Sequence, residues 1–119
     1  MAPSGVLQRQ LGALGGFACA GAVALGAYAS HGVSGQPQAW LQTASLYLFL
    51  HGLALLCLSP SAHSRLDRAG LGIMTFGLAL FCGSLIGAAL FGASTRLAPM
   101  GGSALILSWL AIGVARLRT

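Results

Sequence analysis

Three polar side chains, Thr43, Tyr47 and His51, recur every four residues within an otherwise apolar stretch from Trp40 to Leu58. At that spacing they lie along one face of a helix. A histidine in the middle of an apolar helix of about 18 residues lies near the centre of a bilayer, where a polar group must find a partner inside the protein. We therefore predict a buried polar cluster in which these three residues meet Ser84 of a neighbouring helix.

His51 has two interpretations. One is a ligand, a proton relay or a coenzyme contact, since ionisable residues inside membranes often mark function. The other is a neutral imidazole that hydrogen-bonds a neighbouring helix through Ser84 or a backbone carbonyl. The apolar segments offer no second ionisable group at the same depth, which favours the hydrogen-bonding interpretation.

Other patterns that could bind metals or perform catalysis are weak. No two histidines have a ligand spacing and no carboxylate lies in an apolar segment, which disfavours a zinc or di-iron site within one chain. Haem held by His51 from two copies of the chain remains an alternative. Four-helix multidrug exporters of similar length use a glutamate inside the membrane for proton coupling. The only acid here, Asp67, lies in a hydrophilic loop, which disfavours proton-driven antiport. We expect no cofactor, no metal and no enzymatic activity.

The composition is that of a membrane protein. Of the 119 residues, 56% are hydrophobic and only 6% are charged, and the mean hydropathy is +0.84. A soluble domain carries roughly a quarter charged residues, so this chain has too few to cover a water-exposed surface. The net charge of +5 does not indicate nucleic-acid binding, because the arginines lie at the ends of apolar runs and form no stripe.

Four apolar segments are each long enough to span a bilayer as a helix. They cover approximately residues 8–29, 40–58, 65–91 and 99–115. The short connections favour an all-α membrane protein, an up-and-down four-transmembrane-helix bundle, with residues 1–119 as a single integral membrane domain. Ser64, followed three residues later by Asp67, is typical of a helix N-terminus.

The first segment has an alternative interpretation as a cleavable signal peptide. An Ala-x-Ala sequence, Ala27 to Ala29, precedes Ser30 and resembles a cleavage site. Against cleavage, the apolar run extends to about 18 residues, which is longer than the usual core of a signal peptide.

Small residues recur at helical spacing in three segments, where they let helix backbones approach closely. The predicted helix-packing residues are Gly12, Gly16, Ala20, Ala79, Gly83, Gly87 and Gly101. Rings with a polar edge near the ends of segments are expected at the membrane interface. These are Tyr28, His31 and Trp40.

The arginine distribution predicts the orientation. If the N-terminus faces the cytoplasm, five arginines lie inside and only Arg96 lies outside. The positive-inside rule therefore predicts both termini on the cytoplasmic side of a bacterial inner (plasma) membrane, or in the matrix if the membrane is the mitochondrial inner membrane.

Four motifs in order resemble a known family. They are LGAYASHG, TASLYLFLHGLALL, LFCGSLIGAAL and LAPMGGSALILSWL. Together they resemble the YgdD/YwdK-like small membrane proteins, the family of domain of unknown function four-two-three, which has eukaryotic members. The resemblance implies four transmembrane helices and no established activity. It also adds Gly102 to the helix-packing residues and Trp109 to the interface residues.

From these observations we expect a small integral membrane protein with a structural or accessory role, packed through its Gly/Ala ridges. Its partners are then the lipid bilayer and either further copies of itself, in a homo-oligomer, or a larger membrane complex. The alternative is a cofactor- or ion-binding membrane protein, using haem, a metal or a proton relay, centred on His51.

Overall fold

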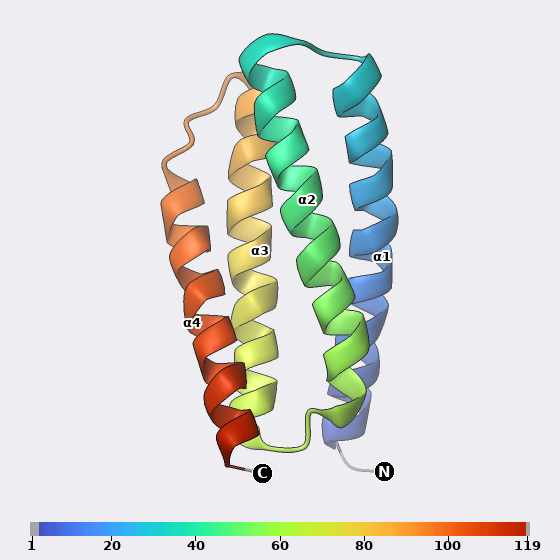
Figure 1. Ribbon diagram of the computed structural model, residues 1–119, viewed down its shortest axis with the longest axis vertical. Coiled ribbons are helices and arrows are strands. Elements are labelled where there is room, and N and C mark those ends of the chain that lie inside the picture. The colour runs from blue at the N-terminus through green and yellow to red at the C-terminus, as the bar shows by residue number, and fades with distance from the viewer. Residues whose placement is uncertain (1–2, 119) are drawn as a thin grey trace.

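The computed structural model describes residues 3–118, with side chains from Gly5 onward, and its regular structure is helical (Figure 1). The elements are α1 (Pro3–His31), α2 (Gly35–Leu58), a short 3-10 helix η1 (Ser59–Ser61), α3 (Arg65–Phe91) and α4 (Leu97–Leu117). All four α-helices are long and apolar enough to cross a membrane. The longest dimension of 46 Å is close to the full thickness of a bilayer with its headgroups, about 40–45 Å. The predicted all-α fold with four spanning helices is confirmed.

Three of the four α-helices begin at an earlier residue than the apolar segments predict. α2 begins at Gly35 instead of near Trp40, so that Pro37 lies in its first turn, where a missing backbone N–H costs no hydrogen bond. The start of α3 is fixed by Ser64, whose hydroxyl accepts a hydrogen bond from the backbone N–H of Asp67 at 3.0 Å. That bond is the N-terminal cap that the Ser64–Asp67 spacing predicts.

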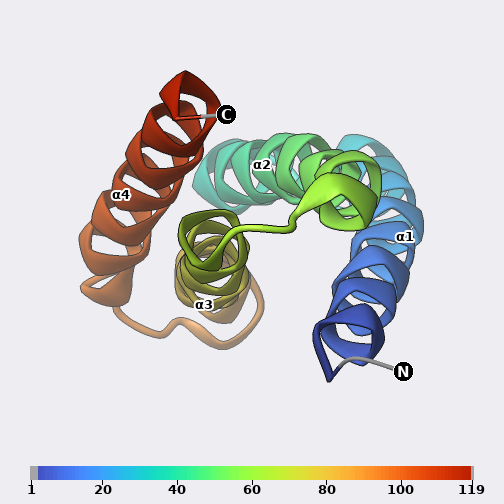
Figure 2. The ribbon, with the colours of Figure 1, turned by 90° about the horizontal axis from the view of Figure 1, so that it is seen from below.

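Each helix packs mainly on its neighbours in sequence: α1 on α2, α2 on α3, and α3 on α4. Seen along the bundle, the helices form an open arc, with α1 and α4 at its two ends (Figure 2). Because the helices alternate in direction, both described ends of the chain lie at the same end of the bundle (Figure 1).

The α1–α2 and α3–α4 pairs are each held by glycines in direct backbone contact. A methyl group built on Gly52 would lie 2.9 Å from the carbonyl oxygen of Gly15, and one on Gly15 would overlap the Gly52 carbonyl. In the second pair, a methyl group on Gly77 would lie 2.9 Å from the carbonyl oxygen of Gly101. Such contacts require glycine, because any side chain would push the two helices apart.

Two glycines of α3 allow a matched test of this packing. Gly77 lies at the crossing with α4, where a new methyl group would also meet Ala104 Cβ at 2.8 Å, whereas Gly72 faces open space. We expect Gly77→Ala to lower the free energy of unfolding by about 1–3 kcal/mol through overpacking. Gly72→Ala should leave it unchanged or raise it by up to about 1 kcal/mol, because alanine is the better helix former. Denaturant titration in mixed micelles, followed by circular dichroism, measures the free energy of unfolding of both variants. Equal changes in the two variants would contradict close backbone contact between α3 and α4 at Gly77.

Candidate functional site

His51 lies in the interior, with 6% of its surface exposed, and both of its ring nitrogens have a partner. Its Nδ1 is 2.8 Å from the backbone carbonyl oxygen of Tyr47, and its Nε2 is 3.0 Å from the indole Nε1 of Trp109 on α4. An indole N–H can only donate, so Nε2 must accept, and Nδ1 must carry the proton that it donates to the carbonyl. The contacts therefore fix a neutral imidazole in one tautomer.

Aromatic rings surround this histidine. The ring of Tyr47 stacks on it with centroids 5.7 Å apart and also contacts Phe81 of α3 at 4.6 Å. The Trp109 ring is tilted at 5.8 Å from the imidazole. These rings line a groove of about 550 Å³ between α2 and α4, which Pro99 and Ile106 of α4 extend. His51 thus lies at the base of a mainly apolar groove.

The structure brings together only part of the predicted polar cluster. Tyr47 and His51 lie side by side, but the Tyr47 side chain is 36% exposed and Thr43 is also exposed. The Ser84 hydroxyl donates to the carbonyl of Ser94 at 3.5 Å, beside the α3–α4 connection. The reason is depth. His51 is seven residues from the end of α2 and Ser84 is seven from the end of α3, and these two helix ends lie at opposite ends of the antiparallel bundle.

Trp109, which the sequence placed at the membrane interface, lies eight residues before the end of α4. This distance corresponds to about 12 Å along a helix. The ends of α4 and α2 lie at the same end of the bundle (Figure 1), so counting back from them would have placed Trp109 at the depth of His51. The other ring residues, Tyr28, His31 and Trp40, lie near the α1–α2 connection.

In α4, the predicted helix-packing residues face α3. Gly101 abuts the backbone of Phe81, and the position of a side chain on Gly102 would be 3.9 Å from the Phe81 ring. In α1, a methyl group on Gly12 would lie 3.0 Å from the Ser59 hydroxyl. These three glycines therefore contact another element of the same chain.

Four of the other predicted helix-packing residues face away from the neighbouring helices. They are Gly16, Ala20, Ala79 and Gly83. Gly87 is half-buried, and a methyl group on it would lie 3.7 Å from Ala93 in the α3–α4 connection. The buried seam of α1 is offset from the predicted ridge and comprises Leu11, Gly15, Ala22 and Ala29. Contact of the outward residues with other chains stays a prediction.

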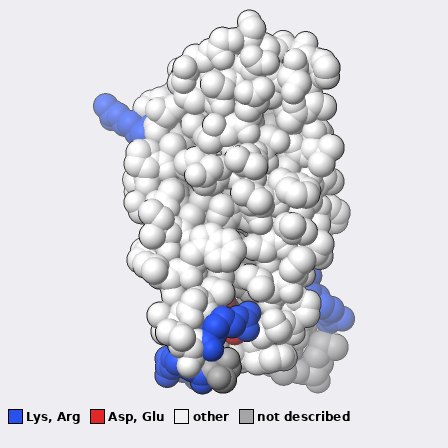
Figure 3. Space-filling model, in the orientation of Figure 1, with Lys and Arg blue, Asp and Glu red and all other residues white. Residues whose placement is uncertain are grey.

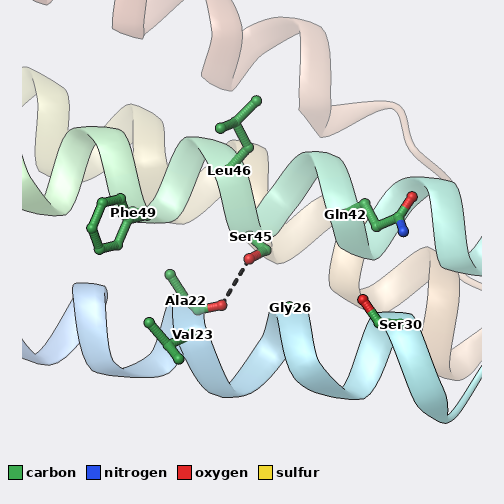
Figure 4. A pocket seen from close by; sticks show the side chains of 8 residues that line it. All are labelled: Ala22, Val23, Gly26, Ser30, Gln42, Ser45, Leu46 and Phe49. Atoms are coloured by element: carbon green, nitrogen blue, oxygen red, sulfur yellow. Dashed lines mark hydrogen bonds between the residues drawn. The ribbon is translucent and has the colours of Figure 1, made fainter.

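A second groove, of about 330 Å³, lies between α1 and α2 toward their connection (Figure 4). Its polar floor is the Ser45 hydroxyl, which donates to the carbonyl oxygen of Ala22 at 2.7 Å. Ser30 and Gln42 line the end nearest the connection (Figure 4). Because a methyl group on Gly26 would lie 2.8 Å from the Ser45 hydroxyl, this groove also depends on a small residue.

The thiols do not converge on one site. Cys82 is buried and its Sγ donates to the Ala44 carbonyl at 3.5 Å, whereas Cys57 is exposed. Within residues 3–118, no three His, Cys, Asp or Glu side chains are close enough together to hold a metal ion.

Four spanning helices packed through small residues, with one buried histidine, define a small polytopic membrane protein. The chain belongs to the family described as "Protein of unknown function (DUF423)", whose model matches residues 25–102. It is 34% identical over 109 residues to the "UPF0382 membrane protein" of Haemophilus influenzae, covering 84% of this chain and 85% of that protein. No solved structure matches. The family resemblance of the four motifs is thereby confirmed.

A double-mutant cycle tests the link between His51 and Trp109. Trp109→Phe removes the indole N–H but keeps an aromatic ring, and His51→Leu removes the acceptor. We expect Trp109→Phe to destabilise the protein by about 1 kcal/mol alone and by about 0.6 kcal/mol less when His51 is already leucine, the average coupling for polar contacts in membranes. Unfolding titrations of the four proteins in detergent give this coupling; an equal cost in both backgrounds would show that the hydrogen bond contributes nothing.

Proposed function

We propose that this protein is a structural or accessory membrane component that packs against a further transmembrane helix through α1 and α3. The observation that carries the proposal is an unfilled groove of about 230 Å³ between these two helices. Leu48 and Leu55 of α2 form its base, Ala18 of α1 forms one wall, and Ala79 and Gly83 of α3 form the other. A helix whose side chains enter this groove would complete the open arc of the bundle.

The outward glycines support the same proposal. Gly72 and Gly83 of α3 and Gly16 of α1 have open space where a side chain would extend. A glycine that faces lipid gains no packing and is a poor helix former, whereas a glycine that faces another helix permits close approach. The helix could come from a second copy of this chain or from a larger membrane complex.

The alternative function, cofactor or ion handling at His51, has less support from the geometry. A ligand at Nε2 would have to displace the indole of Trp109, and Nδ1 is held by the Tyr47 carbonyl. The hydrogen-bonded histidine therefore supports a structural role within the bundle.

We further infer that the end of the bundle with both termini faces the cytoplasm of a bacterial plasma membrane, or the matrix if the membrane is mitochondrial. The basis is the positive-inside rule. Arginines in α1, at the start of α3 and at the end of α4 lie toward this end, whereas Arg96 precedes α4 at the other.

Reporter fusions test this orientation. Green fluorescent protein fused after residue 118 should fluoresce in a bacterial host, because it folds in the cytoplasm, and alkaline phosphatase fused after Arg96 should be active, because it requires the periplasm. As controls, green fluorescent protein fused after Arg96 should not fluoresce, and alkaline phosphatase fused after residue 118 should be inactive. Phosphatase activity at the C-terminus would invert the proposed topology.

The partner helix is tested by filling the groove. Gly83→Leu puts a bulky side chain into it, and Gly113→Leu makes the same change at a glycine of α4 that also faces open space but lies outside the groove. We expect Gly83→Leu to abolish association and Gly113→Leu to preserve it, with both monomers equally helical. Energy transfer between labelled copies in bilayers detects self-association, and co-purification from native membranes detects a larger complex. Unchanged association in both assays would refute the proposal.

A further inference from the structure

The arginines of this protein gather at one end of the molecule. Figure 3 shows basic side chains there, with a small acidic patch among them, whereas Arg96 precedes α4 toward the opposite end. Arg65 and Arg68 open α3, and Arg116 and Arg118 close α4 at the same end. Three of these residues lie in two helices that pack directly on each other, and Arg118 follows the last residue of α4.

Two of the four arginines have partners within the fold. Arg116 pairs with Asp67 at 3.6 Å, and the carboxylate side chain is only 3% exposed. Arg68 donates to the backbone carbonyl of His63 at 2.6 Å. Asp67 is the only acidic residue in the sequence, so its pairing with Arg116 leaves no other side-chain carboxylate to neutralise the remaining arginines.

The other two arginines line a cavity. It measures about 290 Å³ and is formed by Ser64, Arg65 and Leu66 at the start of α3 and by Ala115 and Arg118 at the end of α4. Within residues 3–118, neither Arg65 nor Arg118 makes a side-chain hydrogen bond or an ion pair. Within residues 3–118, the cavity is therefore bordered by two positive charges, Arg65 and Arg118, neither of which pairs with the Asp67 carboxylate.

We propose that this cavity binds a phosphate group, carried by an anionic phospholipid or present as free phosphate. Guanidinium groups bind phosphate oxygens in a two-point geometry. The cavity lies at the ends of spanning helices, which is the depth of lipid headgroups, and anionic lipids attract arginines at the membrane surface. The first turn of α3 also borders the cavity, and the dipole of a helix favours an anion there. This site is independent of the α1–α3 groove.

Lipid retention by the intact, detergent-purified protein tests the site. Native mass spectrometry compares dioleoyl phosphatidylglycerol, which is anionic, with dioleoyl phosphatidylcholine, which has the same chains and no net charge. The variants are Arg65→Gln and Arg118→Gln, with Arg96→Gln as the matched control, since it removes the same charge from the opposite end. We expect the affinity for phosphatidylglycerol to fall about fivefold for each cavity arginine removed and to change less than about twofold in the control.

Two further measurements separate the possible sources of the phosphate and the effects on folding. Displacement of phosphatidylglycerol by millimolar inorganic phosphate would assign the cavity to free phosphate, and resistance to displacement would assign it to the lipid. Arg118→Lys keeps the charge but loses the two-point geometry, so it should fold normally and bind with an intermediate affinity. Equal retention of the two lipids by the wild type with no effect of inorganic phosphate, or an equal loss of phosphatidylglycerol in Arg96→Gln and in the cavity variants, would overturn the proposal.

Discussion

Direct contact between glycine backbones fixes the two helix pairs of this protein. At Gly15 and Gly52, and again at Gly77 and Gly101, no side chain separates the paired helices, so their main-chain atoms meet. In lipid, apolar surface gains nothing by leaving one hydrocarbon environment for another, and helix association depends on close van der Waals contact. The positions of α1 and α4 relative to their neighbours therefore depend on these two crossings.

Helix α2 connects the two helix pairs because its different faces contact different helices. Gly52 meets α1, the Ala44 carbonyl accepts a hydrogen bond from Cys82 of α3, and His51 accepts one from Trp109 of α4. The adjacent residues His51 and Gly52 thus contact opposite ends of the arc. A polar residue in this central helix is stable in the membrane because its hydrogen-bonding groups are satisfied within the protein.

The sequence predicted the fold well because a bilayer admits these long apolar segments only as helices. It predicted the pairing less well. Small residues at spacing four show that another helix can pack closely against a helix, but they do not identify which helix does so. In α1, the glycine that contacts α2 is Gly15 and not Gly16. The predicted partner of His51 was Ser84 or a backbone carbonyl of a neighbouring helix. In the structure the carbonyl is that of Tyr47 on the same helix, and the partner on a neighbouring helix is Trp109, which lies at the same depth of the antiparallel bundle. Depth depends on where each helix begins and ends, which residue types alone do not determine.

The order of the helices has a consequence for how the chain folds. Since each helix packs chiefly on the next one in sequence, most contacts join segments separated by a single short connection. Such low contact order favours rapid folding, and each pair can assemble once its second helix has been synthesised and inserted. The hydrogen bond between His51 and Trp109 joins residues 58 positions apart in the sequence. It can form only after α4 has been inserted, so it forms among the last contacts and stabilises helices that are already packed.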